Sequence, residues 1–342
     1  MSTSALDPNI SFLADTLDRQ QAQVQLQPLF PNLREVTAAT LVRHKLGRRA
    51  LVEYHLTTVE GSLTILGKIR AKGTDWNSYK VQQALWNQGF AANRSDGFSV
   101  PEPLGVLPNW QMWLQRKVSG IPATDVLPTA AGVSLARRIA ALAHKLHHTP
   151  VASPKNHTQT DELRILHTGL LLVADQHPHW RSRIETILQH CDTAAATIYP
   201  PTHPLIHPCT HALIHRDFYP DQVLVDRDRL WLVDLDLCCH GDPVLDIGNF
   251  IAHITEQSLR QMGDPSAMHE QEVALREAFI QACLTSETSD HHLDANQLRR
   301  AIEHYTVLSL VRHIHISNRI TARQHLTERI LTLCEIRLQQ LE

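Results

Sequence analysis

The sequence predicts an α+β chain of two lobes, a small β-rich N-terminal lobe and a larger, mainly α-helical C-terminal lobe. Three observations support this prediction. β-type residues form strand-like runs up to about residue 118, and from about Ala130 onward the apolar residues recur with helical spacing. Two short apolar runs at 223–225 and 230–233 then interrupt the helical part as a hairpin. We therefore expect lobes at residues 1–118 and 119–342.

The first lobe begins with a helix-like stretch, at about residues 11–26. Strands are expected within residues 40–58 and 62–73, on either side of a turn at 59–62. Residues 76–90 have helical spacing, and Gly89 is the expected stop. β-type residues return at 100–118 and end in a linker-like segment at 119–122. This pattern predicts a small sheet with one helix.

The second lobe is dominated by helical periodicity. The predicted helices are residues 132–150, 162–176, 179–195, 270–284, 295–320 and 322–342. No internal repeat or low-complexity tract interrupts them.

Composition excludes several classes of protein. With 342 residues, 43% hydrophobic and 20% charged, the chain is long enough for two cores. The net charge of -3 offers no polybasic surface for nucleic acid or an anionic membrane. No apolar run approaches the roughly 20 residues that span a bilayer, and the first residues lack a signal core. We therefore expect a cytoplasmic protein whose six cysteines are reduced and which binds neither nucleic acid nor membrane.

The segment His215–Leu237 places six aspartates around the two apolar runs of the hairpin. A turn centred on Arg227 and Asp228 would set Gln222 beside Val233 and bring Asp217 and Asp234 to the same end. Two carboxylates and an amide oxygen suit a hard cation such as Mg²⁺. The alternative is a solvated hairpin with acidic edges.

The spacing of these residues follows the order of the phosphoryl-transfer template. That order is a catalytic base, a metal-binding amide and a metal-binding carboxylate, here Asp217, Gln222 and Asp234. Asp236 could join the metal or face solvent.

Three motifs carry a resemblance to a known family. Residues 214–217 (IHRD), 233–236 (VDLD) and 241–246 (GDPVLD) occur in this order. Together they resemble the motifs of the aminoglycoside phosphotransferase and choline kinase group of small-molecule kinases. The resemblance implies a protein-kinase-like bilobal fold, in which residues 1–118 bind the nucleotide and residues 119–342 hold the catalytic loop and the acceptor site. It also implies ATP and Mg²⁺ as cofactors and a small-molecule hydroxyl as phosphoryl acceptor, in a monomer or homodimer. The acceptor itself is not encoded in any motif.

The resemblance also implies roles for single residues. Asp217 would accept the proton of the acceptor hydroxyl, and Lys68 in the run ILGKIRA would contact the nucleotide phosphates. Residues 114–118, with Gln115 and Val118, would form the hinge beside the adenine. His215 and Asp246 are expected to support the catalytic loop.

The chain departs from the family pattern at three places. Gln222 stands where Asn is expected. The helix after Lys68 offers Gln82 and Gln83 but no Glu, so the lysine's partner would be one of these amides or Asp75. The expected phosphate-covering loop holds Gly47 alone, with four cations that could contact phosphates by charge, namely Arg43, Lys45, Arg48 and Arg49.

These departures keep one other hypothesis open, and a cluster of histidines suggests a second. A nucleotide-binding pseudokinase or regulatory module without transferase activity would show such replacements. A zinc hydrolase is suggested by the cluster His207, Cys209, His211 and His215, although no second cluster with metal-ligand spacing completes its site.

Overall fold

The structure is a computed structural model that describes residues 7–198, 212–285 and 294–341. Its internal contacts group the chain into two compact units. The first contains Met1–Gly120 and Asp226–Asp236, and the second contains Ile121–Val225 and Leu237–Glu342. The segment Asp226–Asp236 therefore packs with the first unit although its neighbours in sequence belong to the second. The assignment of nucleotide binding to residues 1–118 and of acceptor binding to 119–342 stays a prediction.

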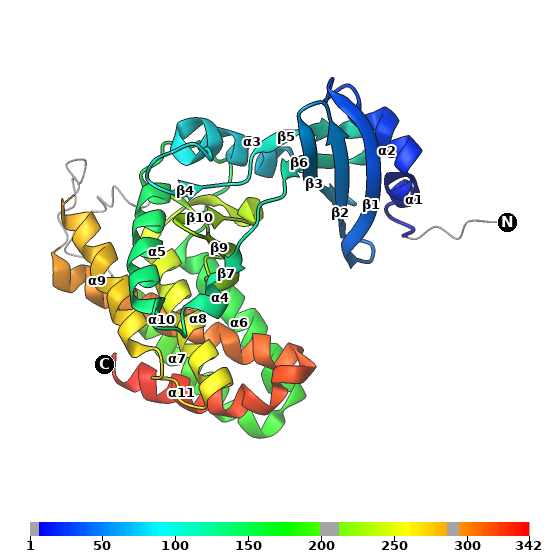
Figure 1. Cartoon of the computed structure of the whole chain (residues 1–342). Helices are drawn as coiled ribbons and strands as arrows, with labels where there is room; N and C mark the ends of the chain where they lie inside the picture. The colour runs from blue at the N-terminus through cyan, green and yellow to red at the C-terminus, as the bar shows by residue number, and fades with distance from the viewer. Residues whose placement is uncertain (1–6, 199–211, 286–293, 342) are drawn as a thin grey trace. The chain divides into compact units, whose positions relative to one another are not determined.

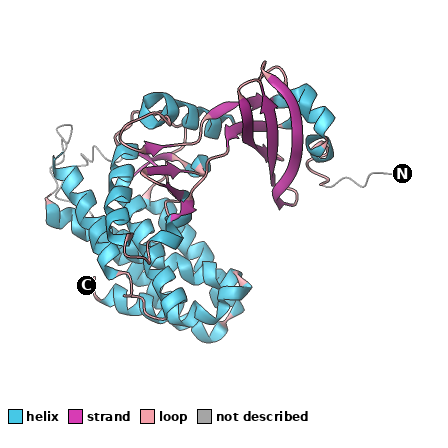
Figure 2. Ribbon diagram, in the orientation of Figure 1, coloured by secondary structure: helices cyan, strands magenta, loops and turns pink. Residues whose placement is uncertain are grey.

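The first unit is built on a five-stranded antiparallel sheet, in the order β1-β2-β3-β6-β5 (Figure 1, Figure 2). Its strands are β1 (Leu33–Lys45), β2 (Arg49–Thr58), β3 (Gly61–Arg70), β5 (Pro103–Leu107) and β6 (Met112–Arg116). The predicted strands are confirmed, and β1 starts seven residues earlier than the expected residue 40. A Cβ at Gly67 of β3 would lie 2.4 Å from Sδ of Met112, so a larger residue there would require the Met112 side chain of β6 to shift.

The helix expected at residues 11–26 is two helices, α1 (Leu13–Leu17) and α2 (Arg19–Leu26). Asp18 between them has extended backbone angles, and its side chain accepts hydrogen bonds from the N–H groups of Gln20 and Gln21. The prediction of one continuous helix was wrong because Asp18 is an N-cap, a role that aspartate performs well. Figure 1 shows both helices beside β1, and their buried leucines, Leu13 and Leu26, join the core of the sheet.

Helix α3 (Trp76–Leu85) follows β3, as predicted. Asp75 is its N-cap and accepts from the N–H of Ser78 at 3.1 Å. The chain leaves helical geometry at Gln88 and Gly89, where Gly89 has a φ of 107°, which confirms the expected stop. Strand β4 (Phe98–Ser99) then pairs in parallel with β10 (Arg229–Leu232), and this pairing ties the segment Asp226–Asp236 to the first unit.

The second unit is mainly helical (Figure 2). Its helices are α4 (Ala123–Val126), α5 (Gly132–His147), α6 (Gln159–Gln176), α7 (Arg181–Thr197), α8 (Pro243–Met262), α9 (His269–Thr285), α10 (Ala295–Arg319) and α11 (Thr327–Gln339). All six predicted helices of this lobe are present. None of the helices in the described part of the chain is both long enough and apolar enough to cross a bilayer.

The long helix α8 was not predicted from the apolar periodicity. Its start was visible in the sequence, because Asp242 caps it by accepting from the N–H of Val244 and Pro243 occupies the first turn. A Cβ at Gly248 would lie 2.5 Å from Cβ of Tyr305, so the glycine allows close packing of α8 on α10. This packing brings side chains of the two helices together beside the catalytic loop.

Two short strand pairs frame that loop within the second unit. Strand β8 (Ala212–Ile214) pairs antiparallel with β11 (Cys239–Gly241), and β7 (Ile121–Pro122) pairs with β9 (Val223–Asp226). Strand β9 and the following strand β10 are separated by Arg227 and Asp228 alone, and Arg227 has a φ of 52°. The predicted strands and the turn between them are therefore confirmed.

Candidate active site

The loop that carries Asp217 follows β8 and is fixed by a buried carboxylate. Asp246 of α8 is fully buried and accepts hydrogen bonds from the backbone N–H groups of His215 at 2.8 Å and Arg216 at 2.7 Å. Arg216 has a φ of 68°, a conformation that costs a non-glycine residue about 1 kcal/mol or more. The two hydrogen bonds hold this bend immediately before Asp217.

A histidine from another helix supports the same carboxylate. Nε2 of His147, near the end of α5, lies 2.9 Å from Oδ2 of Asp246, and both side chains are buried. Asp246 thus joins α5, α8 and the catalytic loop, in agreement with its expected supporting role. A buried carboxylate with this many donors is firmly oriented.

The chain after Asp217 is held by a second residue of α8. Asn249 donates from Nδ2 to the carbonyl of Phe218 at 2.9 Å, and Arg312 of α10 donates to Oδ1 of the same amide. Because Arg312 occupies Oδ1, the amide can only point Nδ2 at the loop. The Phe218 ring also packs against Phe250, with centroids 4.9 Å apart.

Arg312 is itself held by a buried acid. Its Nη1 lies 3.6 Å from Oε2 of Glu162 on α6, whose Oε1 is 2.5 Å from Nε2 of His157. Burial acts to raise the pKa of Glu162, but the hydrogen bond from His157 and the charge of Arg312 hold that pKa below its ordinary value. Glu162 therefore stays ionised and fixes Arg312. No local sequence signal predicts this contact, which joins residues far apart in the chain.

Gln222 closes a tight turn, Pro220–Gln222, directly before β9. Its backbone N–H donates to the carbonyl of Tyr219 at 2.9 Å, and only 7% of the residue is exposed. Asp217 and Gln222 belong to the second unit, whereas Asp234 belongs to the first. The predicted convergence of the three residues therefore stays a prediction.

Lys68 lies in β3, opposite Trp113 of β6. Its ammonium lies 4.9 Å from the centroid of the Trp113 ring, a cation–π contact with a buried aromatic. Nζ is 3.0 Å from Oδ1 of Asp236 and 3.6 Å from Oδ1 of Asp234. Only the first distance is a hydrogen bond, so Asp236 is the main partner of the lysine.

The two predicted metal-binding carboxylates differ in their surroundings. The Asp236 side chain is 10% exposed and also accepts from Arg70, so it does not face solvent. Burial acts to raise the pKa of Asp236, but the charges of Lys68 and Arg70, with Arg49, hold that pKa below its ordinary value. The Asp234 side chain is 36% exposed, on a residue with a φ of 58°. Asp234 is therefore the carboxylate that is open to a cation.

The residues expected to pair with Lys68 have other contacts. Gln82 is buried and donates to the carbonyl of Pro101 at 2.7 Å and to Oε1 of Gln115 at 3.2 Å. Asp75 caps α3 and lies 3.7 Å from Nε of Arg70. The expectation that one of them meets Lys68 was wrong, because Asp236 occupies that position.

The predicted hinge, residues 114–118, begins within β6. Gln115 is 5% exposed, and Val118 lies two residues beyond the end of the strand. The Gln115 side chain accepts a hydrogen bond from Gln82, and the backbone N–H groups of Arg116 and Lys117 donate to the carbonyls of Glu102 and Thr64. Gln115 and Val118 stay predictions as nucleotide contacts.

The expected phosphate-covering loop is a tight turn between β1 and β2. Its glycine, Gly47, has a φ of 68° and donates its N–H to Oδ2 of Asp7 at 2.8 Å. Nε2 of His44 lies 2.8 Å from the same oxygen. Asp7 thus fastens the turn, and no sequence pattern pointed to it. The backbone amide of Gly47 is therefore already bound, and Arg49 stays a prediction as a phosphate contact.

The donor set fits a magnesium site that shares its ligands with phosphate. Among residues 7–198, 212–285 and 294–341, no three His, Cys, Asp or Glu side chains are grouped to hold a metal by themselves. Mg²⁺ is usually bound by one or two carboxylates together with phosphate and water, so the exposed oxygens of Asp234 suffice as its anchor. Of the hypothetical zinc cluster, His207, Cys209 and His211 lie outside the described residues.

Comparison with known proteins gives a family and a fold. The model of the phosphotransferase enzyme family matches residues 69–284. The choline/ethanolamine kinase family protein from Mesorhizobium loti superposes with a TM-score of 0.60 at 15% identity, covering 93% of this chain and 94% of its own. Choline kinase from Cryptosporidium parvum Iowa II gives 0.63 at 11% identity, covering 94% and 96%.

A further solved structure is similar as well. Spectinomycin phosphotransferase, solved with ADP and spectinomycin, superposes with a TM-score of 0.57 at 10% identity, covering 94% of this chain and 99% of its own. Comparison with curated protein sequences gives no match. The structural likenesses confirm the predicted protein-kinase-like α+β fold.

Proposed function

Because the chain belongs to the phosphotransferase enzyme family, we propose that it transfers the γ-phosphoryl group of ATP to a hydroxyl group of a small molecule. The observation that carries the proposal is the fixed loop around Asp217. Asp246 binds the backbone before this residue and Asn249 binds the backbone after it. Phosphoryl transfer depends mainly on positioning and charge, so a base that is held on both sides suits the reaction.

Asp217 is the proposed base, which accepts the proton of the acceptor hydroxyl as transfer proceeds. Lys68 contacts the nucleotide phosphates, and its position is fixed by Trp113 and Asp236. Asp234 and Gln222 are the proposed metal-binding residues. When bound there, Mg²⁺ supplies positive charge to the phosphate oxygens. Arg49, Gln115 and Val118 remain the other proposed nucleotide contacts.

The acceptor is proposed only as a class. Structural neighbours include a choline kinase and a spectinomycin phosphotransferase, and the latter was solved in complex with spectinomycin. Such likeness supports a small-molecule acceptor for this chain without selecting one. A monomer or homodimer located in the cytoplasm remains our expectation for its state and place.

The test is a panel of hydroxyl-bearing acceptors with a phosphate-transfer readout on wild type and Asp217→Asn. We expect turnover with at least one acceptor in wild type, its loss in the variant by at least about 100-fold, and ADP affinity within a few-fold. Asp221→Asn is the matched control, because Asp221 lies four residues on, is exposed and bonds Thr124. Equal turnover in wild type and Asp217→Asn would refute the assignment. ADP binding with no turnover across the panel would favour the nucleotide-binding module instead.

A further inference from the structure

Three cations of the sheet in the first unit surround one carboxylate. Lys68 and Arg70 are alternate residues of β3, so their side chains leave the same face of the sheet. Arg49 of β2 is the strand partner of Arg70 and shares this face. Lys68 and Arg70 both bond Asp236, and the charge of Arg49 acts on the same carboxylate.

Asp236 pairs with Lys68, as a glutamate of the following helix is expected to do. Within the described residues, α3 supplies no carboxylate to Lys68, because Gln82 bonds Pro101 and Gln115 while Asp75 faces Arg70. Asp236 reaches the lysine at 3.0 Å, and Trp113 supports the lysine from the neighbouring strand. The lysine is therefore anchored from the loop after β10.

Arg70 retains donors for a further anion. Its Nη2 bonds Asp236, and its Nε lies 3.7 Å from Asp75, which is an ion-pair distance and longer than a hydrogen bond. No described residue accepts a hydrogen bond from Nη1, and 29% of the side chain is exposed. A guanidinium whose remaining N–H groups reach solvent beside an anchored lysine is arranged to bind phosphate oxygens.

We propose that Arg70 is a second phosphate-binding cation beside Lys68, and that Asp236 holds both cations in place as their common anionic partner. This inference rests on the proposed function, because the ligand is the phosphate group of a nucleoside di- or triphosphate. The glycine-poor turn at Gly47 explains why a second phosphate-binding cation is needed. The amide of that glycine is bound to Asp7, so side-chain charge replaces the backbone amides that glycine-rich loops offer.

The test is calorimetry with ADP and with adenosine, without metal. Arg70→Gln should weaken ADP binding roughly 10- to 100-fold, the range expected for lost charge-assisted hydrogen bonds, and leave adenosine binding within about twofold. Arg70→Lys should recover part of the ADP affinity, because it restores charge without the fork of donors. The control is Arg34→Gln. Arg34 is an exposed strand arginine of the same sheet, in β1, and its loss should not affect ADP binding.

A second arm separates anchoring from metal binding. Asp236→Asn should weaken ADP binding without metal and keep the wild-type enhancement of ATP binding by Mg²⁺, whereas Asp234→Asn should lose that enhancement. The inference is overturned if Arg70→Gln binds ADP as wild type does, if it weakens adenosine and ADP equally, or if Asp236→Asn abolishes the Mg²⁺ effect. Wild type that binds no ADP would refute the proposed function together with this inference.

Discussion

Asp246 and Asn249 lie three residues apart on α8 and bind the backbone on the two sides of Asp217. Asp246 accepts from the N–H groups of His215 and Arg216, and Asn249 donates to the carbonyl of Phe218. Residues three apart share one face of a helix, so a single element positions the proposed base. Helix α8 is therefore a structural part of the proposed active site although it supplies no reacting group.

The first prediction concerns the carboxylate of Asp246. In Asp246→Asn one carboxylate oxygen becomes an NH₂ group, which cannot accept the hydrogen bond of a loop N–H or contact the ring of His147 as the oxygen does. The substitution also removes the negative charge of Asp246. We expect a loss of about 2–4 kcal/mol in the free energy of unfolding and a lower kcat at unchanged KM for ATP. Urea unfolding and steady-state kinetics measure both.

Asp264→Asn is the control for that substitution. Asp264 is an exposed residue of the same unit that accepts from the N–H of Ser266 in a local turn. It should leave the urea midpoint and kcat unchanged within error. An Asp246→Asn protein with the stability and kcat of the control would show that the loop holds its shape without this carboxylate.

The second prediction concerns Arg312, which fixes the orientation of the Asn249 amide. Arg312→Met keeps much of the side-chain volume but frees the amide to rotate and removes the cation beside Glu162. The variant should lower kcat about 10-fold, because Nδ2 of Asn249 no longer has to face Phe218. The variant should also lose about 2–3 kcal/mol in the free energy of unfolding at pH 7, because the buried carboxylate of Glu162 has then lost one of its two partners.

The sign of the pH dependence follows from Glu162. The pKa of Glu162 in the folded protein is below its ordinary value, partly because of the charge of Arg312. The ionised carboxylate therefore stabilises the fold at pH values above the pKa of the unfolded chain. This stabilisation is lost as the pH falls through the pKa of the folded protein. Removing Arg312 raises the folded pKa, and the gap in stability between wild type and Arg312→Met should shrink from pH 7 to pH 4. Urea midpoints at both values test this. A constant gap would mean that Arg312 acts by packing alone.

The sequence predicted the parts of the fold whose signals are local. The strand around Lys68, the turn at Arg227 and the six helices of the second unit follow from periodicity and turn chemistry, and the structure confirms them. The boundary at Asp18 was missed because the capping aspartate was treated as one more helical residue. Helix α8 was missed although its capping aspartate and proline are plain in the sequence.

Contacts between distant residues could not be predicted in this way. Lys68 meets Asp236 across 168 positions and Asn249 meets Arg312 across 63. Their partners are chosen by packing, for example by Gly248, which brings α8 against α10. A motif names the residues that perform chemistry, but the residues that hold them, such as Glu162 and Asp7, follow no spacing rule.

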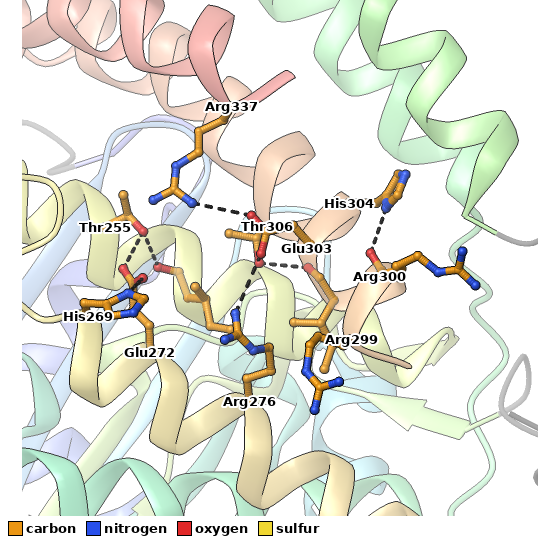
Figure 3. Close-up of polar contacts among 12 residues, drawn as sticks. Thr255, His269, Glu272, Arg276, Arg299, Arg300, Glu303, His304, Thr306 and Arg337 are labelled. Atoms are coloured by element: carbon orange, nitrogen blue, oxygen red, sulfur yellow. Dashed lines mark hydrogen bonds and ion pairs between the residues drawn. The ribbon is translucent and has the colours of Figure 1, made fainter. Parts of the chain in front are cut away.

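The third prediction concerns a buried acid outside the proposed site. Glu272 on α9 is 5% exposed and accepts from Thr255 Oγ1 at 2.6 Å, with Arg276, Glu303 and Arg337 nearby (Figure 3). Burial raises the pKa of Glu272 to about 7 from its ordinary value of 4.5, despite the hydrogen bond from Thr255. The fold therefore binds this proton more tightly than the unfolded chain, and stability should fall as pH rises from about 4.5 to about 7.

Glu272→Gln cannot ionise and keeps an acceptor for Thr255. It should be more stable than wild type at pH 8, by up to about 3 kcal/mol, and show little gain at pH 4. Glu277→Gln on the same helix is the control with the opposite sign. The hydrogen bond from Arg299 lowers the pKa of Glu277, so its loss should slightly destabilise the protein at pH 8. Thermal unfolding at the two pH values checks this. If Glu272→Gln is stabilised equally at both, the substitution acts through packing and not through the loss of an ionisable group.

The last prediction concerns Gln222, which we propose as a metal ligand in place of the usual Asn. Its turn is closed by the hydrogen bond to Tyr219, and the residue is nearly buried, so the amide has few alternative positions. Mg²⁺ tolerates little distortion of its octahedron, and loss of a ligand is felt most when the metal is scarce. Gln222→Ala should lower activity at limiting Mg²⁺ and regain part of it at high Mg²⁺ or with Mn²⁺.

Gln222→Asn should lie between wild type and Gln222→Ala, because the amide oxygen survives while its reach shortens by about 1.5 Å. Gln257→Ala is the matched control. Gln257 is a buried amide of the same unit that donates to the carbonyl of Thr124 at 2.7 Å, so its loss should lower stability and leave the Mg²⁺ titration unchanged. If the Mg²⁺ titration of Gln222→Ala also matches wild type, Gln222 does not touch the metal, and a nucleotide-binding module without transferase activity becomes the better explanation of the replacement.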